Sequence, residues 1–250
     1  YRHVFLRAQV KGMSRESKKA KKERLERIIA KLEEIYPESV CALEYGGDPW
    51  RLLVMGRLSA QCTDARVNIV CRELFAAYPD AWGLANAPLS DVERIIRPCG
   101  LYHTKAESII EASRMLCEEY GGVLPDSMDE LLKFSGVGRK IANLLLGDIY
   151  HKPAIVADTH CIRICGRLGF YPETLKDPYK VELILSELSP PEQQSDFCHR
   201  IVQFGRDVCS ARSMASVYTA SISTMFCFSS AIRILRASRT STLRSLVFLG

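Results

Sequence analysis

Lys140 and Asp158 are the two residues of this sequence whose types and neighbouring residues most strongly suggest a catalytic function. Lys140 follows the sequence Gly-Val-Gly-Arg at 136–139, and Asp158 lies within Val-Ala-Asp-Thr-His at 156–160. A glycine hairpin that opens a helix presents backbone N–H groups and the positive end of the helix dipole to an anion such as a phosphate. That dipole end and any desolvation disfavour the ammonium form of Lys140, and a lysine so placed can act as an amine nucleophile.

Each of these features also has a plain structural interpretation. A Gly-x-Gly pair between two apolar helices is often only a helix C-cap and turn. A lysine after a turn is often a solvated surface charge. Asp158, followed by Thr159, has the residue type of an N-cap for the next helix, which would explain it without chemistry. The residues alone leave these alternatives open.

Helices are the elements that must position these residues. Apolar residues recur at helical spacing over 17–35, behind a lysine-rich start, and Asp48-Pro49 predicts the beginning of another helix. Further helices are expected over 140–150, 162–168, 178–188 and 196–208. Three pairs have capping-box spacing: Ser90/Glu93, Thr104/Glu107 and Ser127/Glu130. Period-2 alternation is nearly absent, so the expected fold class is all-α with short loops.

The composition fits a globular protein, with 47% hydrophobic and 25% charged residues in a chain of 250. The net charge of +5 permits a polyanionic partner. Residues 213–250 carry four arginines and no acid, so 34 − 4 = 30 basic residues face 29 acidic ones in 1–212. DNA affinity would therefore have to come from local patches. The ten cysteines show no Cys-x-x-Cys or disulfide-framework spacing, which predicts reduced thiols in a cytoplasmic protein.

The two ends of the chain differ from its body. Residues 1–16 are expected to be a disordered or non-native leader, because Met13 precedes the lysine-rich helix and no signal-peptide pattern is present. Residues 213–250 are serine-rich and have no clear helical period. The uncharged segment 213–232 has the length of a membrane span, but eight of its twenty residues are Ser or Thr. No membrane association is therefore expected.

Four motifs in this order resemble the helix-hairpin-helix DNA glycosylases, and within them the endonuclease III family. They are Ser-Ala-Gln-Cys-Thr-Asp at 59–64, Gly-Leu-Tyr-His-Thr-Lys-Ala at 100–106, the glycine hairpin with Lys140, and Asp-Thr-His at 158–160. The resemblance implies two helical lobes with a DNA-binding cleft between them. A six-helix barrel would span 42–152, with the helix-hairpin-helix at about 131–150. Residues 17–41 and 153–212 would form the second lobe.

The resemblance also implies a bifunctional DNA glycosylase and AP lyase of base-excision repair. Lys140 would attack C1′ of a damaged nucleoside and form an imine, Asp158 would assist, and β-elimination would follow. Oxidised pyrimidines and abasic sites are the favoured substrates, because relatives that remove adenine from mismatches lack this amine. The implied DNA-binding residues are Gln61 and Leu101 as wedges, with His103, Gly136, Val137, Gly138, Arg139 and His160. The expected partner is damaged double-stranded DNA, bound by a monomer on chromosomal DNA in the cytoplasm.

The sequence departs from the family pattern at the C-terminal iron–sulfur motif. A [4Fe–4S] cluster needs four thiolates, spaced Cys-x6-Cys-x2-Cys-x5-Cys in this family. Cys209 matches the first position, but the next three are Ser216, Thr219 and Met225, and Cys227 is out of register. The cluster is therefore expected to be absent and not required for the chemistry, with 213–250 an atypical tail in its place. A shifted reading frame or an aberrant C-terminus is our hypothesis for this tail.

Two other functions stay open at this point. The chain could be a non-catalytic or destabilised DNA-binding remnant, in which the hairpin still grips phosphate but Asp158 is no longer positioned. It could also be a monofunctional glycosylase for another lesion.

Overall fold

The computed structural model describes residues 16–209 and residue 211, and all regular secondary structure within them is helical. This confirms the expected all-α fold class. In chain order the elements are α2 (Lys18–Ile35), α3 (Pro49–Leu58), α4 (Asp64–Ala77), α5 (Ala81–Ala85), α6 (Leu89–Ile96), η1 (Arg97–Cys99), α7 (Tyr102–Tyr120), α8 (Met128–Leu131), α9 (Arg139–Asp148), α10 (Thr159–Arg167), α11 (Pro178–Leu188), η2 (Pro191–Gln193) and α12 (Gln194–Asp207).

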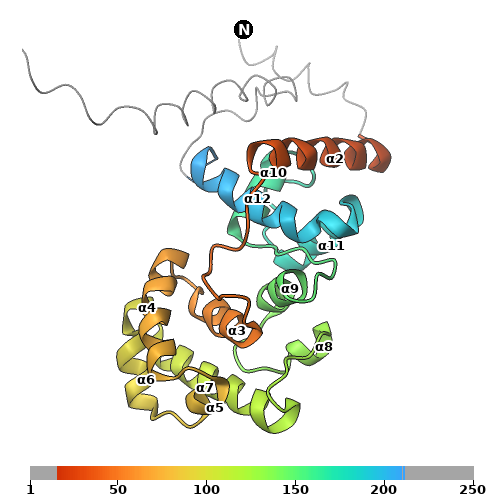
Figure 1. The fold of residues 1–250 in the computed structure, drawn as a ribbon. Helices are drawn as coiled ribbons and strands as arrows, with labels where there is room; N and C mark the ends of the chain where they lie inside the picture. The colour runs from red at the N-terminus through yellow and green to blue at the C-terminus, as the bar shows by residue number, and fades with distance from the viewer. Residues whose placement is uncertain (1–15, 210, 212–250) are drawn as a thin grey trace, which may run out of the picture.

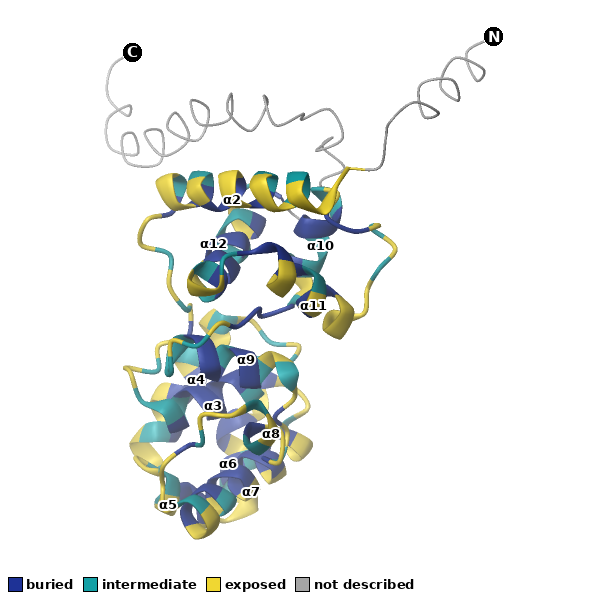
Figure 2. Ribbon diagram, turned by 90° about the vertical axis from the view of Figure 1, so that its right-hand side faces the viewer, coloured by how far each residue is buried: buried dark blue, intermediate teal, exposed yellow. Residues whose placement is uncertain are grey.

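The helices form two lobes, each around its own hydrophobic core (Figure 1). The core of the first lobe, α3 to α9, is built from residues between 43 and 154. The core of the second lobe combines residues of α2 with residues between 155 and 209. Figure 2 shows buried residues concentrated inside each lobe and exposed residues on the outer faces of the helices. The chain therefore enters the second lobe twice, once before and once after it builds the first.

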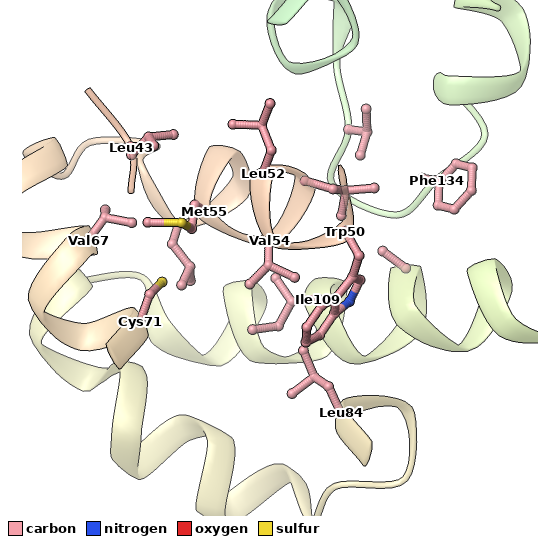
Figure 3. Close-up of a cluster of buried hydrophobic side chains, with 14 of the residues drawn as sticks. Leu43, Trp50, Leu52, Val54, Met55, Val67, Cys71, Leu84, Ile109 and Phe134 are labelled. Carbon is pink, nitrogen blue, oxygen red and sulfur yellow. The ribbon is translucent and has the colours of Figure 1, made fainter. Parts of the chain in front are cut away.

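Trp50 anchors the core of the first lobe, where it lies near Leu84 and Ile109 (Figure 3). Its indole Nε1–H donates to Ser113 Oγ at 2.9 Å, so the polar atom is satisfied inside an apolar core. Its ring centroid lies 5.3 Å from that of Phe75 in α4. These contacts hold the first turn of α3 against α4 and α7.

Local capping explains where several helices begin. Asp48 and Ser127 each accept a hydrogen bond from a backbone N–H in the first turn of the helix that follows, as the sequence predicts. Ser17 caps α2 in the same way. The capping boxes expected at Ser90 and Thr104 are wrong. Helix α6 begins earlier, at Leu89 after Pro88, and α7 begins at Tyr102, which places both residues inside their helices. The Thr104 hydroxyl donates to the Leu101 carbonyl instead of accepting from Glu107.

Helices α9 and α12 join the two lobes. A Cβ added at Gly147 would lie 2.6 Å from Ser195 Oγ, so glycine permits a close approach of the two helices. Asp148 accepts a hydrogen bond from Ser195 Oγ at 3.0 Å, and its Oδ1 lies 2.7 Å from His199 Nε2. Because α9 begins with Lys140 in its first turn, this contact fixes the second lobe relative to Lys140.

Parts of the sequence-based predictions lie outside the described residues. These are the expected leader, apart from Glu16, and the atypical tail 213–250 with Ser216, Thr219, Met225 and Cys227. Among the helices of residues 16–209, none combines the length and the apolar character that crossing a membrane requires.

Candidate active site and DNA-binding face

A pocket between the two lobes contains both residues singled out for chemistry. Its lining includes Lys140 from the first lobe and Asp158 from the second. Apolar side chains of Ile141, Leu144 and Val156 complete part of the wall. The structure therefore brings Lys140 and Asp158 to one shared cavity although they belong to different lobes.

Lys140 is the second residue of α9, directly after the glycine hairpin. The helix has Gly138 at its N-cap, so no side chain caps its first N–H groups, and they stay available to an anion. Lys140 itself is exposed, and its Nζ has no hydrogen bond or ion pair with any residue in the described part of the chain. An exposed amine without an internal partner at a pocket wall can reach a bound substrate.

Asp158 serves as an N-cap and as a wall of the pocket at the same time. Its Oδ1 accepts from the Cys161 N–H at 2.7 Å, which starts α10. The other oxygen, Oδ2, has no hydrogen-bond partner within residues 16–209. The capping interpretation is thus confirmed, yet it uses only one carboxylate oxygen and leaves the other for chemistry.

His160 lies beneath α12, where only a glycine leaves room for it. A Cβ added at Gly205 would lie 2.3 Å from His160 Nδ1. Burial lowers the pKa of His160, although the nearby Asp158 carboxylate raises it. The neighbouring Arg163 bonds the Cys209 carbonyl at 2.8 Å. His160 is therefore held against α12, half-buried beside Asp158, which limits how it can reach DNA.

Two ion pairs between the lobes lie beside the pocket, and the sequence analysis predicts neither of them. Arg139 donates from Nε to Glu182 Oε2 at 3.0 Å and pairs with Oε1 through Nη2, and its guanidinium lies over the Tyr179 ring. Arg206 pairs with Asp64. The partners of each pair lie far apart in sequence, so no local sequence pattern could predict the pairing. Arg139 is consequently occupied by Glu182 in this structure and is not a free cation at the hairpin.

The two expected wedge residues share an unusual backbone conformation. Gln61 has φ 54° and Leu101 has φ 50°, both in the left-handed region that non-glycine residues rarely adopt. Both side chains are exposed, and Leu101 is 57% exposed despite being apolar. Strained and exposed residues of this kind concentrate at functional sites. Gln61 also lies between Ser59 and Asp64, which both line the pocket.

His103 is the second residue of α7, two residues after Leu101. Its Nδ1 is 2.7 Å from Glu93 Oε1, and its ring stacks at a tilt on that of Tyr102, with centroids 4.1 Å apart. The His103 side chain stays exposed, at 66% of its surface. It therefore remains accessible on the side of the first lobe that carries Leu101.

The hairpin glycines differ in what they permit. Gly136 has φ +75°, and a Cβ there would lie 2.5 Å from Arg57 Nε, whereas nothing lies within 4 Å of a Cβ at Gly138. Arg57 supports the hairpin from below by donating to Ser108 Oγ at 2.8 Å. Val137 is buried and fixes the tip of the hairpin in the first core.

Gly136→Ala should destabilise the protein by about 2 to 4 kcal/mol, because it combines a left-handed φ with a collision against Arg57. Gly138→Ala is the matched control and should change stability by less than about 1 kcal/mol, since its Cβ enters open space. Urea denaturation of both variants measures the difference. Equal stabilities would contradict the hairpin geometry described above.

The fold and this pocket define a two-lobed, helix-hairpin-helix DNA-repair protein. Residues 54–191 match the profile of the HhH-GPD superfamily of base excision DNA repair proteins. The chain is 41% identical over 194 residues to an endonuclease III of Synechocystis, an alignment that covers 77% of this chain and 87% of the relative. The chain belongs to the endonuclease III family, and it is thus a DNA glycosylase of base excision repair.

Two solved structures show the same arrangement. A non-covalent endonuclease III–DNA complex matches with a TM-score of 0.73 and 38% identity, over 77% of this chain and 89% of that one. A trapped endonuclease III–DNA covalent intermediate with an estranged adenine matches with the same values. These similarities confirm the two-lobed helical fold and support DNA as the binding partner.

Proposed function

We propose that this protein is a bifunctional glycosylase and AP lyase in which Lys140 is the nucleophile and Asp158 its carboxylate partner. The observation that carries the proposal is the single pocket that both residues line from opposite lobes. The relative captured as a covalent DNA intermediate supports a covalent step in this family. Oxidised pyrimidines and abasic sites are the proposed substrates.

The proposed chemistry begins with the neutral Lys140 amine. Its lone pair attacks C1′ of the extruded nucleotide, and the glycosidic C–N bond breaks, so that the base leaves with the bonding electrons and takes up a proton. Ring opening then gives an iminium between Nζ and C1′. This iminium acidifies the C2′ proton, and loss of that proton expels the 3′ phosphate by β-elimination. The Oδ2 oxygen of Asp158 stabilises the positive charge on the sugar and moves the proton.

Trapping with borohydride tests the covalent step directly. The protein is incubated with duplex DNA that contains either an abasic site or a thymine glycol, and borohydride is added to reduce any imine to a stable amine. A protein–DNA adduct with both substrates supports the bifunctional enzyme. An adduct with abasic DNA alone points to another lesion. Binding without an adduct on either substrate would mean a DNA-binding remnant or a monofunctional glycosylase.

We further propose that DNA lies across the hairpin and the loops of Gln61 and Leu101, with these two side chains filling the gap that the extruded nucleotide leaves. His103 and His160 would approach the strand near the gap. We propose that the protein acts as a monomer, since the two lobes of one chain supply both Lys140 and Asp158 to the pocket. The nine cysteines of the described residues are all free, which supports action in a reducing compartment such as the cytoplasm.

We also propose that the chain does not hold the family's [4Fe–4S] cluster. Cys209 stands alone among the expected ligand positions, and its Sγ accepts a hydrogen bond from Arg167 at 3.1 Å. Cys161 and Cys198 lie in the same lobe, but their mutual hydrogen bonding and burial raise the pKa of the Cys198 thiol well above its usual value. A protonated thiol is a poor cluster ligand.

The purified protein should accordingly contain no iron and show no visible absorption from a cluster. Metal analysis and an absorption spectrum of protein purified without oxygen measure this. A stoichiometric iron content near four would contradict the proposal.

A further inference from the structure

Lys105 is completely buried in the first lobe and has no part in the chemistry above. It lies in the first turns of α7 with no exposed surface, which is rare for a lysine. Its ammonium group donates three hydrogen bonds, to the carbonyls of Leu58 at 2.9 Å, Ala60 at 2.7 Å and Cys99 at 2.9 Å. All three donors are thus used, and no carboxylate is among the partners.

The three carbonyls belong to two separate loops. Leu58 is the last residue of α3, and Ala60 directly precedes Gln61. Cys99 ends η1 and lies two residues before Leu101. The carbonyls at a helix end lack partners within the helix and carry negative partial charge, so a cation placed there is favourable. One ammonium group therefore ties the loop that follows α3 to the loop that precedes α7.

These loops hold Gln61 and Leu101, the two proposed wedge residues, which are both exposed and both have left-handed backbone. A positive φ at Gln61 and at Leu101 persists only when the surrounding structure enforces it. The bonds from Lys105 reach the carbonyl next to Gln61 and the carbonyl two residues before Leu101. The Cys62 N–H adds a turn bond to the Ser59 carbonyl at 3.1 Å, but this bond stays within one loop. The hydrogen bonds of Lys105, in contrast, connect the two loops to each other.

We infer that Lys105 is a positioning residue that sets the distance and orientation between Gln61 and Leu101, so that both enter the gap in the DNA together. The inference rests on the proposed wedge function of those two residues. Lysine suits this position because its flexible stem is buried along α7 and its three donors match three carbonyls. Burial also lowers the pKa of Lys105, because desolvation disfavours its charged form.

A test compares two DNA substrates with the variant Lys105→Met, which keeps the length of the stem but has no donor. In one substrate the abasic nucleotide is paired within a duplex, so a gap must be filled when it leaves the stack. In the other it forms a single-nucleotide bulge, whose departure leaves continuous stacking. We expect Lys105→Met to slow borohydride trapping on the duplex by about tenfold or more relative to the bulge. Wild-type protein sets the reference ratio.

Ser113→Ala is the matched control, because it removes a buried hydrogen bond from the same helix, to Trp50, away from both loops. It should lower stability but leave the ratio between duplex and bulge unchanged. If Lys105→Met also leaves the ratio between duplex and bulge unchanged, Lys105 is only structural and the inference fails. If wild-type protein forms no adduct on either substrate, the proposed function fails instead.

Lys105→Met leaves three buried carbonyls without a donor and could prevent folding. Hydrogen–deuterium exchange of the wild-type protein then supplies a test that needs no variant. The amides of Ser59, Cys62 and Gly100 donate to nearby backbone carbonyls. They should exchange slowly, because opening either loop must also break the bonds of Lys105. Fast exchange at either loop, comparable to that of an untethered surface loop, would overturn the inference.

Discussion

Lys140→Ala is expected to abolish the borohydride-trapped adduct and to lower base removal and strand cleavage by about 10³-fold or more. The variant deletes the amine that the proposed mechanism needs for attack at C1′. It leaves the fold in place, since Lys140 is exposed and its Nζ has no partner among the residues that the structure describes. Gel electrophoresis of reduced reactions on abasic duplex DNA measures the adduct, and single-turnover cleavage measures the rate.

Lys133→Ala provides the control for lost positive charge near the hairpin. Lys133 is also exposed and lies seven residues before Lys140, but it pairs with Glu130 at 2.7 Å and is absent from the lining of the pocket. Both variants remove one cation, so both should weaken binding slightly and in a salt-dependent way. Only Lys140→Ala should lose the adduct. An undiminished adduct in Lys140→Ala would show that another amine is the nucleophile.

The parts of the fold that local chemistry decides could be predicted from the sequence. Asp48, Ser127 and Asp158 each start a helix, because a side-chain oxygen next to a helical run meets the free N–H groups of the first turn. The same reasoning failed at Thr104. There Leu101 adopts a left-handed φ and becomes the N-cap, so the helix begins before the expected box. A backbone conformation of that kind depends on the tertiary contacts around it.

In the candidate site, too, some features follow from local sequence and others depend on tertiary contacts. Lys140 and Asp158 could be chosen from their residue types, but their shared pocket exists only because the lobes dock. That docking depends on the contact of Asp148 with Ser195 and His199, and on the pairing of Arg139 with Glu182. Such contacts join residues that no spacing rule relates. Lys105 is a similar case. Its burial and its bonds to the carbonyls of Leu58, Ala60 and Cys99 depend on tertiary packing, so the sequence alone does not distinguish it from a surface lysine.

Contacts between α9 and α12 also hold the geometry of the pocket. The contacts of Asp148 and Gly147 with α12 are buried, and they lie before residue 210. They connect α9 directly to the helix that precedes Cys209. The relative placement of Lys140 and Asp158 is therefore set by packing within residues 16–209.

Asp158→Asn should slow base removal by about 10²- to 10⁴-fold while changing stability by less than about 1 kcal/mol. Asparagine is as good an N-cap as aspartate, so its side-chain oxygen can still accept from the Cys161 N–H. The negative charge next to the pocket is lost, and with it the stabilisation of a positively charged sugar and the route for the proton. Single-turnover excision of thymine glycol measures the rate, and thermal melting measures stability.

Asp158→Ala separates the two functions of this residue. It removes both the charge and the cap, so its excision rate should match that of Asp158→Asn while its stability falls by a further ~1 kcal/mol. The informative result is how the excision rate and the stability of the two variants compare, because a carboxylate that only caps α10 would give the opposite pattern. In that case Asp158→Asn would excise at the wild-type rate, and activity would fall only with the loss of stability in Asp158→Ala.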